Sequence, residues 1–123
     1  MVLLYVDDDT DDQDILREIV TTINPSIEVI GMRDCENAIG YLSSAEILPN
    51  IIIVDINMPG GDGFDCLKYV KEDDRLNKIP VIIYSTSISP RDTEMCRKFK
   101  ALACLQKACT FQEGLDRLGK FLL

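Results

Sequence analysis

The sequence predicts an α/β fold in which a parallel sheet of five strands carries helices on both faces. Two observations predict it. Short, continuous apolar runs alternate with segments whose apolar residues recur at helical spacing, in the order βαβαβαβαβα. The 123 residues show no internal repeat, linker or low-complexity tract, and their length suits one domain over 1–123 with a single core.

The first half of the chain predicts three strands and two helices. Val2–Val6 has the continuous apolar run of a strand that is buried in a parallel sheet. The next segment is helical in its spacing, and Asp9 or Thr10 is the expected cap. The expected elements are, in order, a strand over 2–6, a helix around 14–20, a strand over 27–32, a helix over about 34–44 and a central strand over 51–54.

Turn and capping residues bound the elements of the second half. A loop rich in Pro and Gly, residues 58–63, precedes the third helix. Ser89-Pro90-Arg91-Asp92 combines a capping serine, a proline at the first helical position and an acid in the first turn. Thr110 and Glu113 have the spacing of a capping box. The expected elements are a helix over 64–72, a strand over 80–84, a helix from 90, a strand over 104–106 and a last helix after 110.

Composition excludes several classes of function. Thirteen Lys and Arg stand against 21 Asp and Glu, and this net charge of −8 argues against nonspecific binding to nucleic acid. No apolar run approaches the roughly 18 residues of a membrane helix, and no leader precedes the first strand, so we expect a cytoplasmic protein that does not bind membranes.

The five cysteines lack CxxC spacing and are expected to be reduced and mostly buried. Without histidine, Ser-His-Asp and Cys-His catalysis and most zinc hydrolase sites are excluded.

Acidic, hydroxyl and lysine side chains stand where four of the expected strands end. They are Asp7 and Asp8 after the first strand, Asp55 after the third, Ser85 and Thr86 after the fourth, and Lys107 after the fifth. Parallel strands share one carboxyl edge, so these side chains should converge. Two carboxylates 4 Å apart repel by about 4 kcal/mol at an effective dielectric near 20, so three of them need a cation. A site with few protein oxygens and room for water suits Mg²⁺ better than Ca²⁺.

The same set of residues suits phosphoryl transfer. This reaction requires charge neutralisation on three equatorial oxygens and an in-line nucleophile. Mg²⁺ is expected to neutralise one oxygen, the Lys107 ammonium a second, and the Ser85 hydroxyl with loop N–H groups the third. Asp55 is the expected nucleophile, because aspartyl phosphates are an established class of covalent intermediate.

Two unrelated kinds of site share parts of this pattern. Asp7-x-Asp9-x-Asp11 with Glu18 mimics an EF-hand loop, but Asp12 stands where glycine is needed and a strand precedes it. A haloacid-dehalogenase-like phosphatase needs Thr or Val where Asp11 stands, and the chain is short for that fold. Lys107 fits a surface lysine when taken alone. The acids at positions 9, 11, 12 and 14 are expected to be the cap and exposed first turns of the first helix.

Taken together, these motifs resemble the response regulator receiver domain of two-component signalling over essentially the whole chain. They are the acid pair, Val54-Asp55-Ile56-Asn57-Met58-Pro59 with Gly60-Gly61-Asp62-Gly63 behind it, Ile79–Ser85 and Lys107. The resemblance implies a flavodoxin-like, doubly wound sheet of strand order 2-1-3-4-5. It also implies a phosphoacceptor at Asp55 with intrinsic self-phosphorylation and autodephosphorylation, rather than an enzyme.

The resemblance further implies a ligand set and a donor. Asp8 and Asp55 would coordinate Mg²⁺ directly, the backbone carbonyl of Asn57 would be a third ligand, and Asp7 would act through water. The phosphoryl donor would be a phosphohistidine of a sensor histidine kinase or a phosphotransfer protein.

Two positions depart from the family pattern. The residue after the lysine is usually a proline in a cis peptide, and here it is Ala108. We expect the Lys107–Ala108 bond to be trans, because a cis bond before a non-proline residue costs about 2.5–4 kcal/mol. The position three before the lysine is usually an aromatic that swings inward on activation, and here it is Cys104. Neither departure removes a residue that the chemistry needs.

For output, the resemblance implies a downstream protein bound by the fourth helix, fifth strand and fifth helix, roughly 89–100 and 104–122. The last helix ends the chain, so we expect no output domain. Basic residues gather on this face, although they also fit solvated helix surfaces; they are Arg91, Arg97, Lys98, Lys100, Arg117 and Lys120. The alternative function is a receiver-fold interaction module that does not depend on phosphorylation, and the complete set of acids, hydroxyl and lysine speaks against it.

Overall fold

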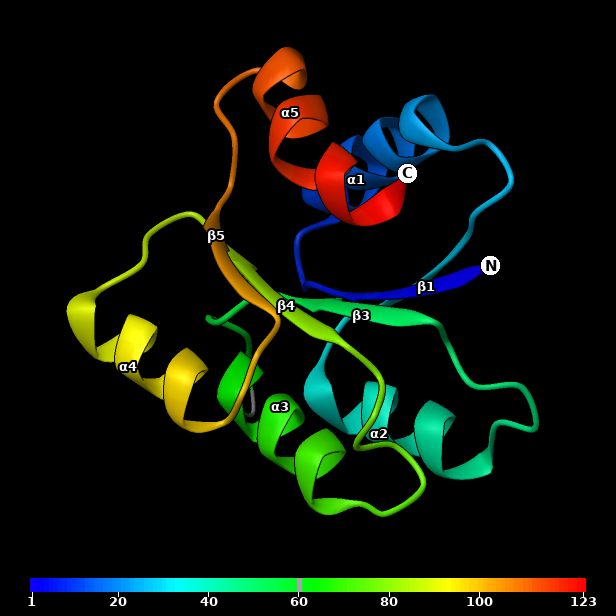
Figure 1. Cartoon of the computed structure of the whole chain (residues 1–123), viewed down its shortest axis with the longest axis vertical. Helices are drawn as coiled ribbons and strands as arrows, with labels where there is room; N and C mark the ends of the chain where they lie inside the picture. Colours follow the sequence, from blue (N-terminus) through cyan, green and yellow to red (C-terminus); the bar gives the residue numbers. More distant parts are fainter. Residues whose placement is uncertain (60) are drawn as a thin grey trace.

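The computed structural model describes residues 1–59 and 61–123 as one parallel sheet between two layers of helices (Figure 1). The strands are β1 (Val2–Val6), β2 (Glu28–Met32), β3 (Ile51–Val54), β4 (Val81–Ser85) and β5 (Ala103–Gln106). The helices are α1 (Thr10–Ile23), α2 (Cys35–Ser44), α3 (Gly63–Glu72), α4 (Pro90–Lys98) and α5 (Phe111–Leu122). The strand order is β2-β1-β3-β4-β5, which confirms the doubly wound flavodoxin-like fold.

Each strand lies within one residue of its predicted position. The largest difference is at β4, which runs from Val81 to Ser85 instead of over 80–84. Pro80 has no N–H to donate, so it stands just before the strand, although its carbonyl still accepts from Ile52 N–H at 3.0 Å. Ser85 is therefore the last strand residue and not the first loop residue.

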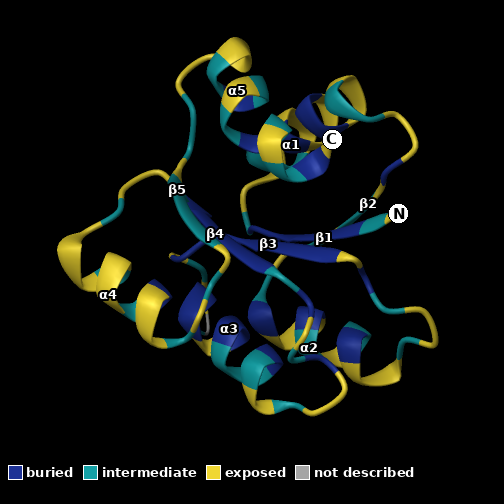
Figure 2. Ribbon diagram, viewed as in Figure 1, coloured by how far each residue is buried: buried dark blue, intermediate teal, exposed yellow. Residues whose placement is uncertain are grey.

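Side chains alternate between the two faces of the sheet along each strand, and this divides the core into two halves. Leu4 and Val6 face the side that is covered by α2, α3 and α4, whereas Leu3 and Tyr5 face α1 and α5 (Figure 1). The strands of the sheet centre are buried on both faces, and the exposed residues of the helices lie on their outer sides (Figure 2). This arrangement explains why the central strands are continuous apolar runs in the sequence.

Side chains cap the helices largely as predicted. Asp9 caps α1 by accepting from Asp12 N–H at 2.9 Å, and Ser89 and Asp92 form the reciprocal box of α4. At α5 only half of the predicted box forms. Thr110 accepts from Glu113 N–H at 3.1 Å, but the Glu113 carboxylate accepts from the N–H of Cys109 instead of that of Thr110. Among the described helices, none has the length and apolarity that a membrane crossing requires.

The cysteines are free thiols and most are buried, as predicted. Cys35, Cys66 and Cys96 are buried, Cys104 is partly buried and Cys109 is exposed. Burial, with the neighbouring Cys104 thiol as a second cause, raises the pKa of the Cys96 thiol, so Cys96 of α4 is neutral and apolar in character.

Candidate functional site

Three carboxylates converge at the carboxyl edge of the sheet, where β1 and β3 end. One carboxylate oxygen from each of Asp7, Asp8 and Asp55 lies within 4.8 Å of the other two. Asp7 is fully buried and Asp55 is 8% exposed, whereas Asp8 is partly exposed. The pairing of Val6 with Val54 in the parallel register explains this proximity, because both strands deliver their next residue to the same edge.

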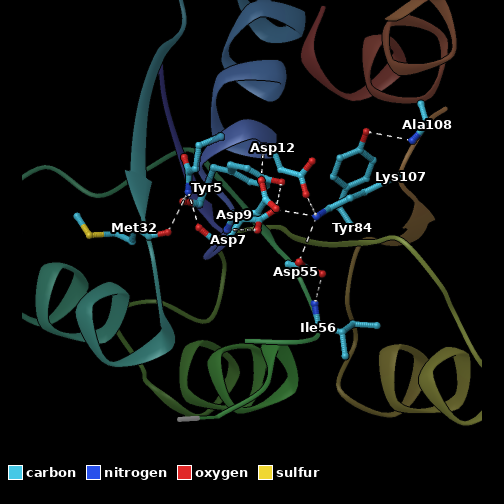
Figure 3. A network of polar contacts seen from close by, with 11 residues as sticks. Tyr5, Asp7, Asp9, Asp12, Met32, Asp55, Ile56, Tyr84, Lys107 and Ala108 are labelled. Atoms are coloured by element: carbon cyan, nitrogen blue, oxygen red, sulfur yellow. Dashed lines mark hydrogen bonds and ion pairs between the residues drawn. The ribbon is translucent and has the colours of Figure 1, made fainter. Parts of the chain in front are cut away.

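Asp7 is held in place by fixed donors. Tyr5 Oη donates to Asp7 Oδ2, and the N–H of Asp9 donates to Asp7 Oδ1 at 3.0 Å (Figure 3). The backbone N–H of Asp7 donates to the carbonyl of Met32 at 3.0 Å. Burial, reinforced by the charge of Asp7, raises the pKa of Tyr5 above its ordinary range, so the hydroxyl remains a donor.

Lys107 reaches into the same cluster from the end of β5. Its Nζ lies 2.7 Å from Asp7 Oδ2 and 3.1 Å from Asp55 Oδ2 (Figure 3). It also lies 2.7 Å from Asp12 Oδ2 on α1. Burial by itself would lower the pKa of Lys107, but the hydrogen bonds to Asp12 and Asp7 outweigh it and raise the pKa above its ordinary value. The lysine is therefore a fixed positive charge beside Asp55.

The Asp55 carboxylate is oriented by its own loop. Asp55 Oδ1 accepts from the N–H of Ile56 at 2.7 Å, and the backbone N–H of Asp55 donates to the carbonyl of Val6 at 2.9 Å. Gly63 passes so close behind it that a Cβ there would lie 2.2 Å from the Asp55 carbonyl oxygen. Gly61 has φ +148°, a conformation that favours glycine. These two positions support the predicted tight turn beside the site, and Gly60 lies outside the described residues.

The two remaining predicted residues, Ser85 and Asn57, flank the cluster. Ser85 is 1% exposed at the end of β4, and its carbonyl accepts from the N–H of Lys107 at 2.7 Å. Asn57 is exposed in the loop after Asp55. Within the described residues, neither side chain forms a hydrogen bond to the three carboxylates or to the lysine ammonium. The Lys107–Ala108 peptide is trans, as predicted, like every peptide bond of the described residues.

Two residues of this network are not evident from the sequence. The sequence predicts Asp12 to be an exposed acid of the first helical turn, but it is partly buried and binds Lys107. The helix cap is the sequence feature that could have indicated this position. Because Asp9 caps α1, Asp12 lies in the first turn of the helix, close to the end of β1. Tyr5 is predicted only to belong to a buried strand, and its i, i+2 relationship to Asp7 is the signal for their contact.

The charges of the cluster suit a divalent cation. Asp7, Asp12 and Asp55 share one ammonium, and Asp8 adds a fourth carboxylate beside Asp7 and Asp55, which leaves this region strongly negative. Among the described residues, no protein group donates a hydrogen bond to the Asp8 side chain, so its oxygens are available. Carboxylate oxygens at an edge that is open to water are the donors that hard divalent cations prefer. The acidic cluster is therefore able to hold a divalent metal ion.

Comparison with known proteins agrees with this geometry. Residues 3–119 match the family model of the response regulator receiver domain. Response regulator Rcp1 of Synechocystis sp. is 31% identical over 96 residues, which are 74% of this chain and 65% of that protein. Two-component response regulator ARR16 of Arabidopsis thaliana is 31% identical over 115 residues, 85% of this chain and 70% of that protein. The aligned segment thus spans just under two thirds of the Rcp1 sequence.

Solved structures show the same fold. The phosphorylated cyanobacterial phytochrome response regulator RcpA superposes with a TM-score of 0.89 at 25% identity, covering 98% of this chain and 89% of that one. The Mn²⁺-bound form of response regulator Rcp1 gives a TM-score of 0.89 at 26% identity, covering 98% and 94%.

Proposed function

The chain belongs to the response regulator receiver domain family, and on this premise we propose that residues 1–123 form one receiver domain that accepts a phosphoryl group on Asp55. The reaction depends on Mg²⁺ and passes a signal to a partner protein. One observation carries the proposal. Asp55 belongs both to the carboxylate cluster and to the contacts of Lys107, so it lies between a cation site and a fixed positive charge.

The acids would hold the metal ion. We assign Asp8, Asp55 and the backbone carbonyl of Asn57 as direct ligands of Mg²⁺, and Asp7 as a ligand through water. When bound, the ion neutralises charge on the transferring phosphoryl group. The Mn²⁺-bound structure of Rcp1 supports a divalent cation in this family.

The remaining side chains act on the phosphoryl group. A carboxylate oxygen of Asp55 forms the new O–P bond while the bond from phosphorus to the donor breaks, and the donor leaves with that electron pair. The Lys107 ammonium binds one phosphoryl oxygen, and the Ser85 hydroxyl binds another. The hydrogen bond from Ile56 N–H fixes the carboxylate orientation before the attack. The phosphorylated structure of RcpA supports an acceptor role in this family.

These 123 residues contain no histidine, so a phosphohistidine donor would belong to another part of the signalling system. We propose that the donor is the phosphohistidine of a sensor kinase or of a phosphotransfer protein. The output surface is the face of α4, β5 and α5. Its basic character is weaker than the sequence alone indicates, because Arg97 pairs with Glu94 at 2.6 Å and Arg117 with Glu113 at 3.4 Å.

Acetyl phosphate provides the direct test. With Mg²⁺, the wild type should gain one phosphoryl group by intact-mass spectrometry, and Asp55→Asn should gain none. Asp74→Asn is the matched control, since Asp74 is an exposed acid outside the cluster and should be labelled like the wild type. Chelation of the metal should prevent labelling in every variant. Full labelling of Asp55→Asn would overturn the assignment.

A further inference from the structure

The Lys107 ammonium has no spare donor in this structure. A lysine carries three N–H donors. They are directed at Asp7 Oδ2 (2.7 Å), Asp12 Oδ2 (2.7 Å) and Asp55 Oδ2 (3.1 Å) (Figure 3). A phosphoryl oxygen can therefore gain a bond from Lys107 only if one of the three carboxylates gives up its own.

Asp12 differs from the other two partners. Asp7 and Asp55 also belong to the carboxylate cluster, so a bound divalent cation compensates their charge. Asp12 lies outside that cluster, on α1, and within the described residues Lys107 is the one cation that pairs with it. A cation in the cluster would thus weaken the hold of Asp7 and Asp55 on Lys107 and leave the hold of Asp12 intact.

We propose that Asp12 is a positioning residue that retains Lys107 in the unphosphorylated protein and competes with the phosphoryl group for Lys107 when Asp55 is phosphorylated. This inference rests on the proposed function and adds a competing interaction to it. The Lys107–Asp12 ion pair opposes the phosphorylated form, so its strength adjusts the balance between the two forms. Asp12 acts through Lys107, because that ammonium is what its carboxylate binds.

The surroundings of the pair permit this exchange. Asp12 and Lys107 both line a cavity of about 410 Å³ between α1 and the start of α5. The Asp12 side chain is 34% exposed, whereas that of Lys107 is 11% exposed. A partly solvated carboxylate can exchange an ammonium for water at modest cost, which a fully buried partner such as Asp7 cannot.

Beryllofluoride, a mimic of the aspartyl phosphate, tests the inference at equilibrium. Asp12→Asn keeps the shape of the side chain and removes its charge, so with saturating Mg²⁺ it should bind beryllofluoride about fivefold more tightly than the wild type. Asp12→Glu keeps the charge and should bind within about twofold of the wild type. Calorimetric titration at constant ionic strength measures each dissociation constant.

Asp11→Asn is the matched control. Asp11 stands beside Asp12 in the first turn of α1 and is exposed, so its replacement removes the same charge from the same helix end. It should change the affinity by less than about twofold, because its charge is screened by solvent. An increase as large as that of Asp12→Asn would show that only net charge matters and would overturn the inference.

The remaining outcomes separate this inference from the proposed function. Equal or weaker beryllofluoride binding by Asp12→Asn, with normal acetyl phosphate labelling of the wild type, overturns the role of Asp12 alone. The same holds if Asp12→Glu behaves like Asp12→Asn. Absence of labelling in the wild type overturns the proposed function and this inference with it. Tighter binding confined to Asp12→Asn, in a protein that is labelled, supports both.

Discussion

Asp7 directly follows β1, and the hydroxyl of Tyr5, two residues before it, donates a hydrogen bond to Asp7 Oδ2 (Figure 3). Residues two apart in a strand share a face, so this contact follows from the pleat. Tyr5 is fully buried in the half of the core that contacts α1 and α5. The acidic edge is thereby connected to the packing of the core.

This connection predicts that Tyr5→Phe destabilises the protein. A hydrogen bond to a charged group contributes about 1.5–3 kcal/mol to stability, and the buried Asp7 carboxylate would lose one of its donors. Tyr84→Phe is the matched control. Tyr84 is also a buried strand tyrosine, but its hydroxyl only accepts a 3.5 Å bond from the N–H of Ala108. Denaturant unfolding without metal should show a clearly larger loss for Tyr5→Phe, and equal losses would contradict the prediction.

The metal site predicts unequal effects for the two neighbouring acids. Asp8 is the proposed direct ligand and has no protein donor among the described residues, whereas Asp7 already accepts from Tyr5, Asp9 and Lys107. We expect Asp8→Ala to lower Mg²⁺ affinity by more than about tenfold and Asp7→Ala to lower it less. Calorimetric titration measures both, with the unfolding midpoint as a check that each variant is folded. Wild-type affinity in both variants would refute the site.

The fold and most of the site could be predicted because local signals decide them. Ile51–Val54 is apolar at every position, and Ser89-Pro90 fixes the start of α4. The acids, Ser85 and Lys107 could be placed at one edge of the sheet from the strand ends alone, because parallel strands deliver their ends to one edge. The side chains of Asp7, Asp55 and Lys107 do meet there.

The contact of Asp12 with Lys107 could not be predicted in the same way. The two residues are 95 positions apart, and their meeting depends on how α1 and the segment after β5 lie over the sheet edge. In the sequence, Asp12 is one of several acids at a helix start. The hydrogen bond from the Cys109 N–H to Glu113 could not be predicted either. The N–H groups of Cys109 and Thr110 are neighbouring donors, and only the loop conformation decides which of them Glu113 accepts from.

Two glycines of α5 should respond oppositely to alanine. A Cβ at Gly114 would lie 2.5 Å from Cδ1 of Ile19 on α1, and Ile19 is itself only 2% exposed. We expect Gly114→Ala to destabilise the protein by about 1–3 kcal/mol through overpacking. At Gly119 nothing lies within 4 Å, so Gly119→Ala should stabilise by about 0.5–1 kcal/mol through helix propensity. Thermal unfolding of both variants checks the signs, and destabilisation by both would show that the α1–α5 contact is not the cause.

The last prediction concerns how phosphorylation reaches the output face. Cys104 stands where the family has an aromatic residue, and its small side chain packs beside Cys96 of α4. A rotation of this small side chain should therefore change the surface of α4 and β5 very little. The change should instead begin at Ser85, which ends β4 and is followed directly by the loop to the Ser89 cap of α4. Amide NMR with beryllofluoride and Mg²⁺ should show large shifts over 85–89 and at the start of α4. Asp55→Asn should show none of them, because it lacks the acceptor carboxylate. Shifts confined to the acidic cluster in the wild type would mean that the activated site does not reach this surface.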